Sequence, residues 1–426
     1  MALDMNIGRK VDKWVSPILL GVLFAFSSAR AKLGGPPQPA RLATTPPPGG
    51  APESPESPES PESPGDAPRR VLAMKLYGLG NIAMLLPVLA AFRRTYPDAE
   101  IDFVSLDENR ELLERSGLVD RVVAISGRSY ARLAWDLVRA LAGFRRRRYD
   151  LVLDFEQFIK LSTVLAFLTG APRRIGFNTD GQGRGSLYTT RVVYRDGDHM
   201  SQVFLRLLRP LGVELSPEPL DIRIRDEEVA AAERLLAGSG LPGRGPVVAI
   251  HVGSGPNFYK LALKRWPPEH FGDLADRLVE RFGARVVFTG KGEEERELVR
   301  IARARMKHDS LDACDRLSIG ELLGMLRRAD LTVANDTSVM HLATLVGTPV
   351  TAFFGATDPM QYGPRNPHDV VMYKDLFCSP CLTNYNLKIS YCTNPVCIRS
   401  IGVEETLARI AQQLEAIGSF ERGAAS

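Results

Sequence analysis

The stretch that decides the fold is residues 331–364, LTVANDTSVMHLATLVGTPVTAFFGATDPMQYGP. It begins with an apolar run typical of a buried strand. Helix-capping residues follow, then a helix that is closed by Gly347, and a second strand starts at Val350. Strands that alternate with helices in this way predict a parallel, right-handed βαβ unit.

Polar residues lie between the first strand and the helix: Asn335, Asp336, Thr337 and Ser338. Open α/β sheets bind ligands at the carboxyl edge of their strands, and a helix N-terminus at that edge attracts phosphate. A second turn, residues 355–359, ends the next strand at the same edge. An ordinary, well-capped βαβ turn is the alternative, but the second turn favours a ligand site.

The same alternation recurs upstream and predicts an α/β fold of two Rossmann-like domains that face a central cleft. A chain of 426 residues with 44% hydrophobic residues is long enough for two such cores. The predicted organisation is a basic and apolar membrane-proximal segment (residues 1–34), a disordered Pro/Glu/Ser-rich linker (35–69), an N-terminal Rossmann-like domain (70–216) and a C-terminal one (217–420). A proline-rich stretch, residues 216–219, is the expected short connection between the domains.

The N-terminal segment contains an apolar run at residues 14–29, with basic residues on both sides. It is about 16 residues long, whereas a spanning helix needs roughly 20. A secretory signal and a short membrane span are both open alternatives, and an interfacial anchor with Trp14 at the water boundary is favoured. The linker behind such an anchor would hold a soluble body close to a lipid surface.

The net charge of +4 does not indicate a nucleic-acid-binding protein. The local exception is the run Arg145–Arg148, which is typical of a solvated helix end, with an anionic membrane surface as the second interpretation. Four of the five cysteines cluster: Cys378, Cys381, Cys392 and Cys397. Their spacing fits a tetrahedral zinc site, two disulfides in an exported chain, or free thiols.

Two loops of the C-terminal domain carry charged residues that suit a phosphorylated ligand. Lys264 precedes Arg265-Trp266-Pro267, and a lysine there can bind a pyrophosphate, although a solvated basic loop is equally plausible on spacing alone. Glu294 heads a helix after a glycine turn, where the helix dipole alone favours an acid. In the N-terminal domain, Gly78-Leu79-Gly80 follows a strand, but a lone G-x-G is weak evidence because position 83 is alanine.

Taken together, these loops resemble glycosyltransferase family 9, the ADP-heptose:lipopolysaccharide heptosyltransferase-like enzymes of the GT-B fold. The resemblance runs from about Val71 to Ile401. Its most specific parts are LKRWPPEHF at 263–271, TGKGEEE at 289–295 and NDTSVMHLATLVGTPVTAFFGATDP at 335–359.

The resemblance implies a function for each domain: the N-terminal domain binds the acceptor and the C-terminal domain binds the donor. Lys264 would contact the donor diphosphate, and Glu294 would hold its ribose. Gly253 and Ser254 correspond to the donor phosphate loop, and Gly78 and Gly80 to the acceptor loop. Asp336, Thr337 and His341 match a D-T-G-x-x-H element, in which Ser338 replaces the glycine. Transfer in this family is expected to be inverting and to need no metal or other cofactor.

Asn81 is the main departure from the family, because known heptosyltransferases carry an aspartate there as the general base. An asparagine side chain cannot take up the acceptor's proton. Asp154 and Glu156, at the end of a strand in the same domain, are therefore hypothesised to substitute as the base.

The sequence thus predicts a glycosyltransferase at the cytoplasmic face of the inner membrane, peripheral or N-terminally anchored. Its partners would be a nucleotide-diphospho-sugar such as ADP-heptose, a lipopolysaccharide or other lipid-linked acceptor, and the membrane surface, but not nucleic acid. A catalytically impaired sugar-nucleotide binding protein and a sugar-nucleotide epimerase are the rival interpretations.

Overall fold

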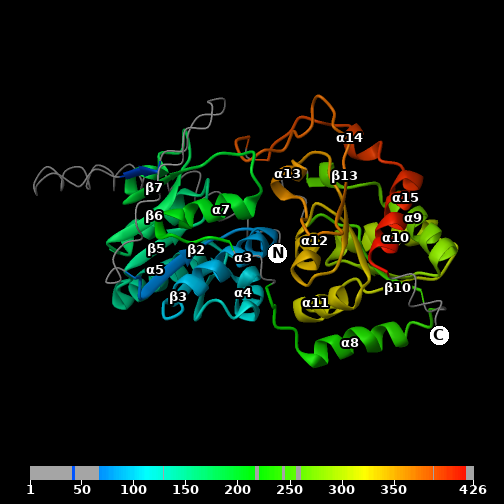
Figure 1. Ribbon diagram of the computed structural model, residues 1–426, viewed down its shortest axis with the longest axis horizontal. Coiled ribbons are helices and arrows are strands. Elements are labelled where there is room, and N and C mark those ends of the chain that lie inside the picture. Colours follow the sequence, from blue (N-terminus) through cyan, green and yellow to red (C-terminus); the bar gives the residue numbers. More distant parts are fainter. Residues whose placement is uncertain are drawn as a thin grey trace, which may run out of the picture. The chain divides into compact units, whose positions relative to one another are not determined.

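The computed structural model describes residues 41–43, 67–127, 129–215, 220–241, 245–255, 261–386 and 388–418. The predicted membrane-proximal segment, residues 1–34, and the predicted connection, residues 216–219, lie outside the described residues. The chain divides into two compact units, Met1–Leu220 and Asp221–Ser426, each built on one parallel sheet (Figure 1). Within the described ranges, no helix has both the length and the apolar character needed to cross a bilayer.

The N-terminal unit contains a seven-stranded sheet in the order β1-β7-β6-β5-β2-β3-β4, with every pair parallel. The strands are β1 (Arg41–Ala43), β2 (Arg70–Met74), β3 (Glu100–Leu106), β4 (Arg121–Ile125), β5 (Leu151–Asp154), β6 (Arg173–Asn178) and β7 (Thr190–Val193). The helices are α3 (Leu79–Thr95), α4 (Arg110–Ser116), α5 (Tyr130–Arg147), α6 (Lys160–Leu168) and α7 (Met200–Leu208), with short 3₁₀ turns η2 (Asp107–Asn109), η3 (Arg184–Leu187) and η4 (Arg209–Leu211).

Strand β1 differs from the prediction, because it falls within the stretch expected to be a disordered linker. Its three residues pair with β7, from Arg41 opposite Thr190 to Ala43 opposite Val192. The edge of β7 presents unpaired backbone N–H and C=O groups, which a passing extended segment can satisfy.

The C-terminal unit contains a six-stranded sheet in the order β10-β9-β8-β11-β12-β13, again parallel throughout. The strands are β8 (Val247–His251), β9 (Arg285–Thr289), β10 (Leu311–Asp312), β11 (Leu331–Asn335), β12 (Val350–Phe353) and β13 (Val370–Met372). The helices are α8 (Asp226–Ala237), η5 (Leu261–Lys264), α9 (Pro268–Phe282), α10 (Glu293–Arg305), α11 (Ile319–Arg328), α12 (Ser338–Leu345), α13 (Pro359–Tyr362), α14 (Val396–Arg399) and α15 (Val403–Ala416).

Both sheets reverse their strand order at one internal position. In the N-terminal unit the reversal lies between β2 and β5, and in the C-terminal unit it lies between β8 and β11. The crevice outside the carboxyl ends of two such strands is where open α/β sheets bind ligands. The predicted site loops follow these strands: residues 76–81 follow β2, Glu156 comes shortly after β5, Ser254 comes shortly after β8, and Asp336 directly follows β11.

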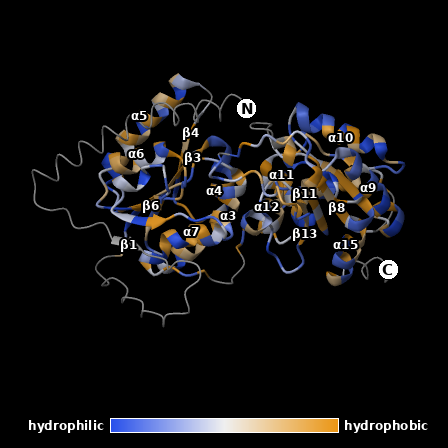
Figure 2. Ribbon diagram, turned by 90° about the horizontal axis from the view of Figure 1, so that it is seen from above, coloured by the Kyte–Doolittle hydropathy of each residue, from blue (hydrophilic) through white to orange (hydrophobic). Residues whose placement is uncertain are grey.

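Strands β8 (VVAIH) and β11 (LTVAN) are fully buried, which is why their sequences are mostly apolar rather than alternating. Figure 2 shows this hydrophobic character on the strands at the centre of the unit. Residues 331–364 therefore fold as predicted, with β11, α12 and β12 forming a parallel βαβ unit.

Candidate functional site

Trp266 fixes the position of the two cations that precede it. Its ring is fully buried, stacks on Phe353 with a centroid separation of 4.1 Å, and donates from Nε1 to the carbonyl of Ile401 at 2.9 Å. Pro267 and Pro268 then start α9, where a missing N–H is harmless. The aromatic anchor thus holds Lys264 and Arg265 at the carboxyl edge of the sheet.

Asn335, the last residue of β11, ties together the loops on either side of the strand reversal. Its side chain is fully buried, and its Oδ1 accepts the backbone N–H of Trp266 at 2.9 Å. Its Nδ2 donates to the carbonyls of Val252 and Gly253 at 2.8 and 3.2 Å. One amide at the end of β11 therefore satisfies backbone groups at both ends of the β8–α9 connection, 69 to 83 residues earlier in the sequence.

Lys264 and Asp336 form a largely buried ion pair, with 2.7 Å between Nζ and Oδ2. Thr357, from the loop after β12, donates to the same carboxylate oxygen at 2.6 Å. Burial alone would raise the pKa of the Asp336 carboxyl, but Lys264, Thr357 and His341 together hold that pKa below its ordinary value. The aspartate is therefore ionised at neutral pH.

His341 lies on α12, one turn after its start, and is buried beside this pair. Burial lowers its pKa to about 4; Asp336 opposes the shift and Lys264 adds to it. The imidazole is therefore neutral at pH 7. Thr337 is the N-cap residue of the helix, where its side chain makes no capping hydrogen bond, and Ser338 is the first helical residue.

Arg265 connects the β8 loop to the start of α10. Its guanidinium donates to Ser254 Oγ at 2.9 Å, to the carbonyl of Gly255 at 3.1 Å and to Glu294 Oε1 at 2.6 Å. The predicted donor residues Ser254 and Glu294 thus meet through Arg265, which was not among the predicted site residues. Its position next to Lys264 was the available signal.

Glu295 and His251 are two further buried residues that the sequence did not single out. Glu295 accepts the backbone N–H groups of Gly255 and Lys291 at 3.2 and 2.9 Å, and it lies 3.7 Å from Nε2 of His251. Burial would raise the pKa of Glu295, yet His251 and these backbone bonds lower it to about 2. A Cβ at Gly253 would lie 2.0 Å from Glu295 Oε1, which explains the glycine as a packing requirement.

In the N-terminal unit, the predicted glycine loop is shorter than expected. Gly78 has φ of 91°, a backbone conformation that suits glycine, and is the N-cap residue of α3. Gly80 and Asn81 are not loop residues, because both belong to the first turn of α3. The Asn81 side chain is close to Gly78, since a Cβ there would lie 2.8 Å from Asn81 Nδ2.

Asp154 does not have the surroundings of a catalytic base. It is fully buried and pairs with Arg184, with 3.0 Å between Nη2 and Oδ2, while Tyr188 donates to the same oxygen at 2.6 Å. Its Oδ1 accepts the backbone N–H of Glu156 at 3.0 Å. Burial raises the pKa of Asp154, against the opposing charge of Arg184.

Glu156 is likewise committed to internal contacts. Its Oε2 lies 2.6 Å from Lys75 Nζ, with both side chains 3% exposed, and its Oε1 accepts the backbone N–H of Leu76 and Tyr77 at 2.7 and 3.2 Å. These bonds fix the loop that leads into α3. The hypothesis that Glu156 or Asp154 acts as a substitute base is not supported by this geometry, because a base must reach the substrate's proton.

The four clustered cysteines and the isolated Cys314 are all free thiols. Burial and the neighbouring cysteines raise the pKa of Cys397, so its thiol is protonated at neutral pH. Within the described part of the chain, the four sulfurs are not among groups of three or more ligand atoms that lie within 4.8 Å of one another. Zinc binding by Cys378, Cys381, Cys392 and Cys397 stays a prediction.

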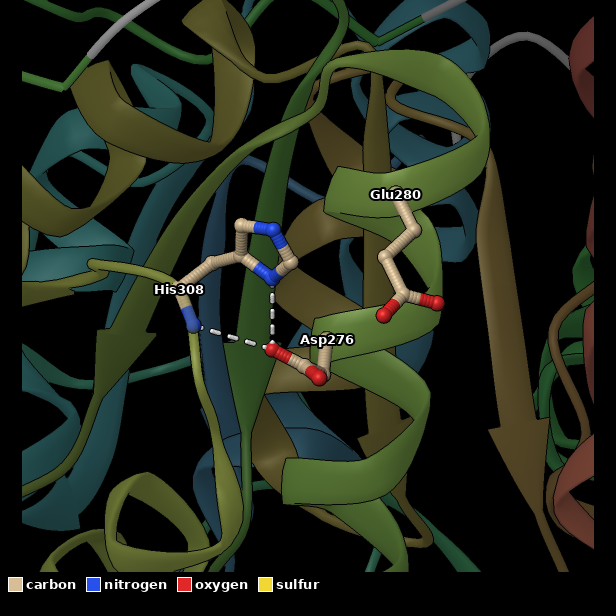
Figure 3. A group of neighbouring side chains, drawn as sticks. All are labelled: Asp276, Glu280 and His308. Atoms are coloured by element: carbon tan, nitrogen blue, oxygen red, sulfur yellow. Dashed lines mark hydrogen bonds and ion pairs between the residues drawn. The ribbon is translucent and has the colours of Figure 1, made fainter.

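Among the described residues, the potential ligand atoms of Asp276, Glu280 and His308 lie within 4.8 Å of one another (Figure 3). Asp276 Oδ1 accepts the backbone N–H groups of Lys307 and His308 at 2.9 and 3.0 Å and lies 2.8 Å from Nδ1 of His308. These bonds stabilise the turn that leads into β10. That turn precedes a strand, so the group lies at the sheet edge opposite the donor loops, and we assign it a structural role.

The parallel sheets and the polar groups at their reversal points define a two-domain α/β protein with buried, paired charges at the carboxyl edge of each sheet. The family model of glycosyltransferase family 9 (heptosyltransferase) matches residues 136–391. This match covers more than half of the chain, which therefore belongs to that family and is a glycosyltransferase.

Relatives and solved structures agree with this assignment. Lipopolysaccharide heptosyltransferase 1 of Pseudomonas aeruginosa is 25% identical over 372 residues, which cover 82% of this chain and 98% of that protein. The glycosyltransferase family 9 structure from Veillonella parvula has a TM-score of 0.67 at 22% identity, covering 82% of this chain and 97% of that one. Heptosyltransferase WaaC of E. coli, solved with ADP, has a TM-score of 0.60 at 17% identity, covering 81% and 99%. The structural matches establish the shared fold.

Proposed function

We propose that this glycosyltransferase transfers heptose from ADP-heptose to a lipopolysaccharide core acceptor, with inversion at the anomeric carbon and without a metal ion. The observation that carries the proposal is the group formed by Lys264, Asp336, Thr357 and Arg265 at the strand reversal of the C-terminal unit. The relative from P. aeruginosa is a lipopolysaccharide heptosyltransferase, and the E. coli neighbour was solved with ADP, which supports both the reaction and the adenine nucleotide.

The two cations suit the donor diphosphate. Lys264 and Arg265 are already held in position by Asp336 and Glu294, so little side-chain freedom is lost when phosphate oxygens replace or join these partners. The N-terminus of α12, where the Thr337 side chain makes no capping hydrogen bond, follows β11 at the same edge and can bind phosphate. As the glycosidic C–O bond to the diphosphate breaks, the leaving group gains negative charge, and these fixed donors stabilise it without a metal.

The acceptor hydroxyl attacks the anomeric carbon directly as the bond to the diphosphate breaks, and its proton passes to solvent water in the same step. Asn81 is proposed to orient this hydroxyl by a hydrogen bond, since its amide cannot accept the proton. Asp154 and Glu156 are proposed as positioning residues: Glu156 fixes the loop that leads to Asn81, and Asp154 holds the backbone of Glu156.

The acceptor is a membrane glycolipid and activated sugars are made in the cytosol, so we place the enzyme at the cytoplasmic face of the inner membrane. Peripheral association with that surface follows from the acceptor. The four cysteines would at most hold a structural zinc ion, and no step of transfer uses it.

Binding of nucleotide-sugars tests the donor assignment. In a thermal-shift panel, ADP-heptose should stabilise the full chain more than UDP- or GDP-sugars do, and Lys264→Met should remove most of that shift. Lys374→Met is the matched control, because Lys374 pairs with Glu405 at the surface of the same unit. No shift with any nucleotide-sugar would contradict the transferase proposal.

Replacing Asn81 by aspartate distinguishes an active transferase from an impaired binding protein. A general base contributes on the order of 10²- to 10⁴-fold. Asn81→Asp should therefore raise kcat for transfer by at least about a hundredfold if the native enzyme works without a base. Donor binding by the native chain with no turnover in either protein would identify a binding protein instead.

A further inference from the structure

Helix α5 (Tyr130–Arg147) has apolar residues on both of its faces. The inner face contributes Leu133, Ala140 and Phe144 to the core of the N-terminal unit. On the opposite side, Ala131, Trp135, Val138 and Ala142 are exposed, with Trp135 63% and Val138 65% accessible. Their spacing of four, three and four residues places them in one line along the helix. A surface helix normally presents polar residues there, so this line is an informative exception.

Arginines border this line of apolar residues. Arg139, Arg145 and Arg146 are exposed, and at 100° per residue they fall on either side of the line. Arg145 donates from Nε to the carbonyl of Leu168 at 3.3 Å, and the residue is exposed. From Ser129 to Arg148 the chain has six arginines and no lysine, against a single acid, Asp136. Asp136 is turned inward, because it accepts the backbone N–H of Ser126 and pairs with Arg132.

Arg147 shows that the arginine run has two separate roles. Its guanidinium pairs with Asp102, which is fully buried, at 3.1 Å, and with Glu100. It therefore anchors the end of α5 to strand β3. The cations that could contact an external partner are the arginines that border the exposed apolar line. Arg148, which ends the helix with a left-handed backbone, is a further one.

We propose that the outer face of α5, defined as Ala131, Trp135, Val138 and Ala142 with Arg139, Arg145 and Arg146, docks on an anionic lipid bilayer. A helix with a Trp-containing apolar line flanked by arginines is the type that lies in the plane of a membrane interface. Arginines at its borders attract acidic headgroups. In Figure 2, hydrophobic and hydrophilic segments alternate along α5 at the margin of its unit. This proposal rests on the proposed function in one respect: the lipid-linked acceptor is the reason why the enzyme would contact a membrane.

Trp135 is a natural reporter of this contact. In a full-length chain with Trp14→Phe, the remaining tryptophans are Trp135 and Trp266, and Trp266 is fully buried. Vesicles of phosphatidylcholine with phosphatidylglycerol, carrying brominated acyl chains, should quench Trp135, whereas neutral phosphatidylcholine vesicles should not. Local quenching separates contact by α5 from any binding by the N-terminal segment.

Two variants test the chemistry of the face. Val138→Glu should abolish quenching of Trp135. Arg139→Gln combined with Arg146→Gln should weaken vesicle binding about 25-fold, since each cation near an acidic surface contributes about fivefold. Val396→Glu is the matched control, because Val396 is 49% exposed in the other unit, and it should change nothing.

Several results would overturn the proposal. Trp135 that stays unquenched by anionic vesicles, or is quenched equally by neutral ones, excludes docking by this face. A Trp135 signal that depends on protein concentration without vesicles, and that Val138→Glu removes, identifies a contact between two copies of the chain instead. Transfer to a water-soluble acceptor fragment should be the same in these variants as in the parent chain. If the parent chain itself shows no such transfer, the proposed function is contradicted, whereas the membrane contact is not.

Discussion

Removing Lys264 should leave Asp336 as an uncompensated buried charge. The two groups are 2.7 Å apart, the aspartate side chain is 7% exposed and the lysine side chain 16% exposed. Breaking a buried pair by removal of one partner costs about 3–5 kcal/mol. Because Lys264 keeps some solvent access, we expect Lys264→Met to lower the unfolding free energy of the C-terminal unit by about 3 kcal/mol at pH 7, the low end of that range.

The pH dependence of this loss follows from the pKa of Asp336. In the native protein that pKa is held below its unfolded value, so the pair contributes its full stability above about pH 4 and loses it as the pH falls further. Without Lys264, only Thr357 and His341 oppose the effect of burial, so the pKa of Asp336 rises. Protonation then removes the buried charge, so the difference between Lys264→Met and the native chain should shrink from pH 7 to pH 5.

Urea unfolding followed by Trp266 fluorescence measures this effect, in a background of Trp14→Phe and Trp135→Phe. Trp266 lies in the core of the C-terminal unit, so its signal reports that unit alone. Adding Asp336→Asn to Lys264→Met should restore most of the loss, and Lys374→Met at a surface pair should cost less than about 1 kcal/mol. The reasoning is refuted if Lys264→Met costs under about 1 kcal/mol at pH 7, or costs the same at both pH values.

Three further outcomes are expected. Glu156→Gln removes the charge that faces Lys75 and weakens the bonds to the 76–77 backbone, so hydrogen exchange at Leu76 and Tyr77 should accelerate at least tenfold while exchange in β11 is unchanged. Since the pKa of His341 falls from about 6.5 in the unfolded chain to about 4 in the folded one, stability present above pH 6.5 should be lost as the pH falls towards 4, by about 3 kcal/mol. His341→Gln should flatten that slope in urea titrations, and an unchanged slope would assign it to other groups. Arg265→Lys cannot reproduce the bonds to Ser254 and Gly255 together, so the Kd for ADP-heptose should rise about tenfold by calorimetry, and an unchanged Kd would remove Arg265 from the donor site.

The sequence predicted the parts of the fold that depend on residues close to one another in the chain. The buried run of β11, its capping residues and the helix that follows are consecutive in the chain, so periodicity and capping rules located them. The short strands β10 and β13 escaped prediction because two or three residues carry no periodic pattern. Strand β1 escaped because its pairing depends on the distant edge of β7.

The site was predictable to the same extent. Asp336 and Lys264 were identified from motif and chemistry, and the structure brings them together across 72 residues of sequence. The partners of Asp154 and Glu156 were not predictable. Arg184 lies well after these carboxylates in the sequence and Lys75 lies well before them, and nothing local indicates either contact. Charge at a strand end suggested a catalytic base, and the structure shows both carboxylates buried and paired with cations.

The amide of Asn335 has a consequence for the kinetics of donor binding. Because a single buried side chain joins the backbone after β8 to the backbone before α9, these two segments should not open independently of each other. The donor should then bind to a preformed site, without loops that close one after another. The rate of donor association would be set by diffusion and by the charges of Lys264 and Arg265, and it should fall steadily with ionic strength, without a slow isomerisation step.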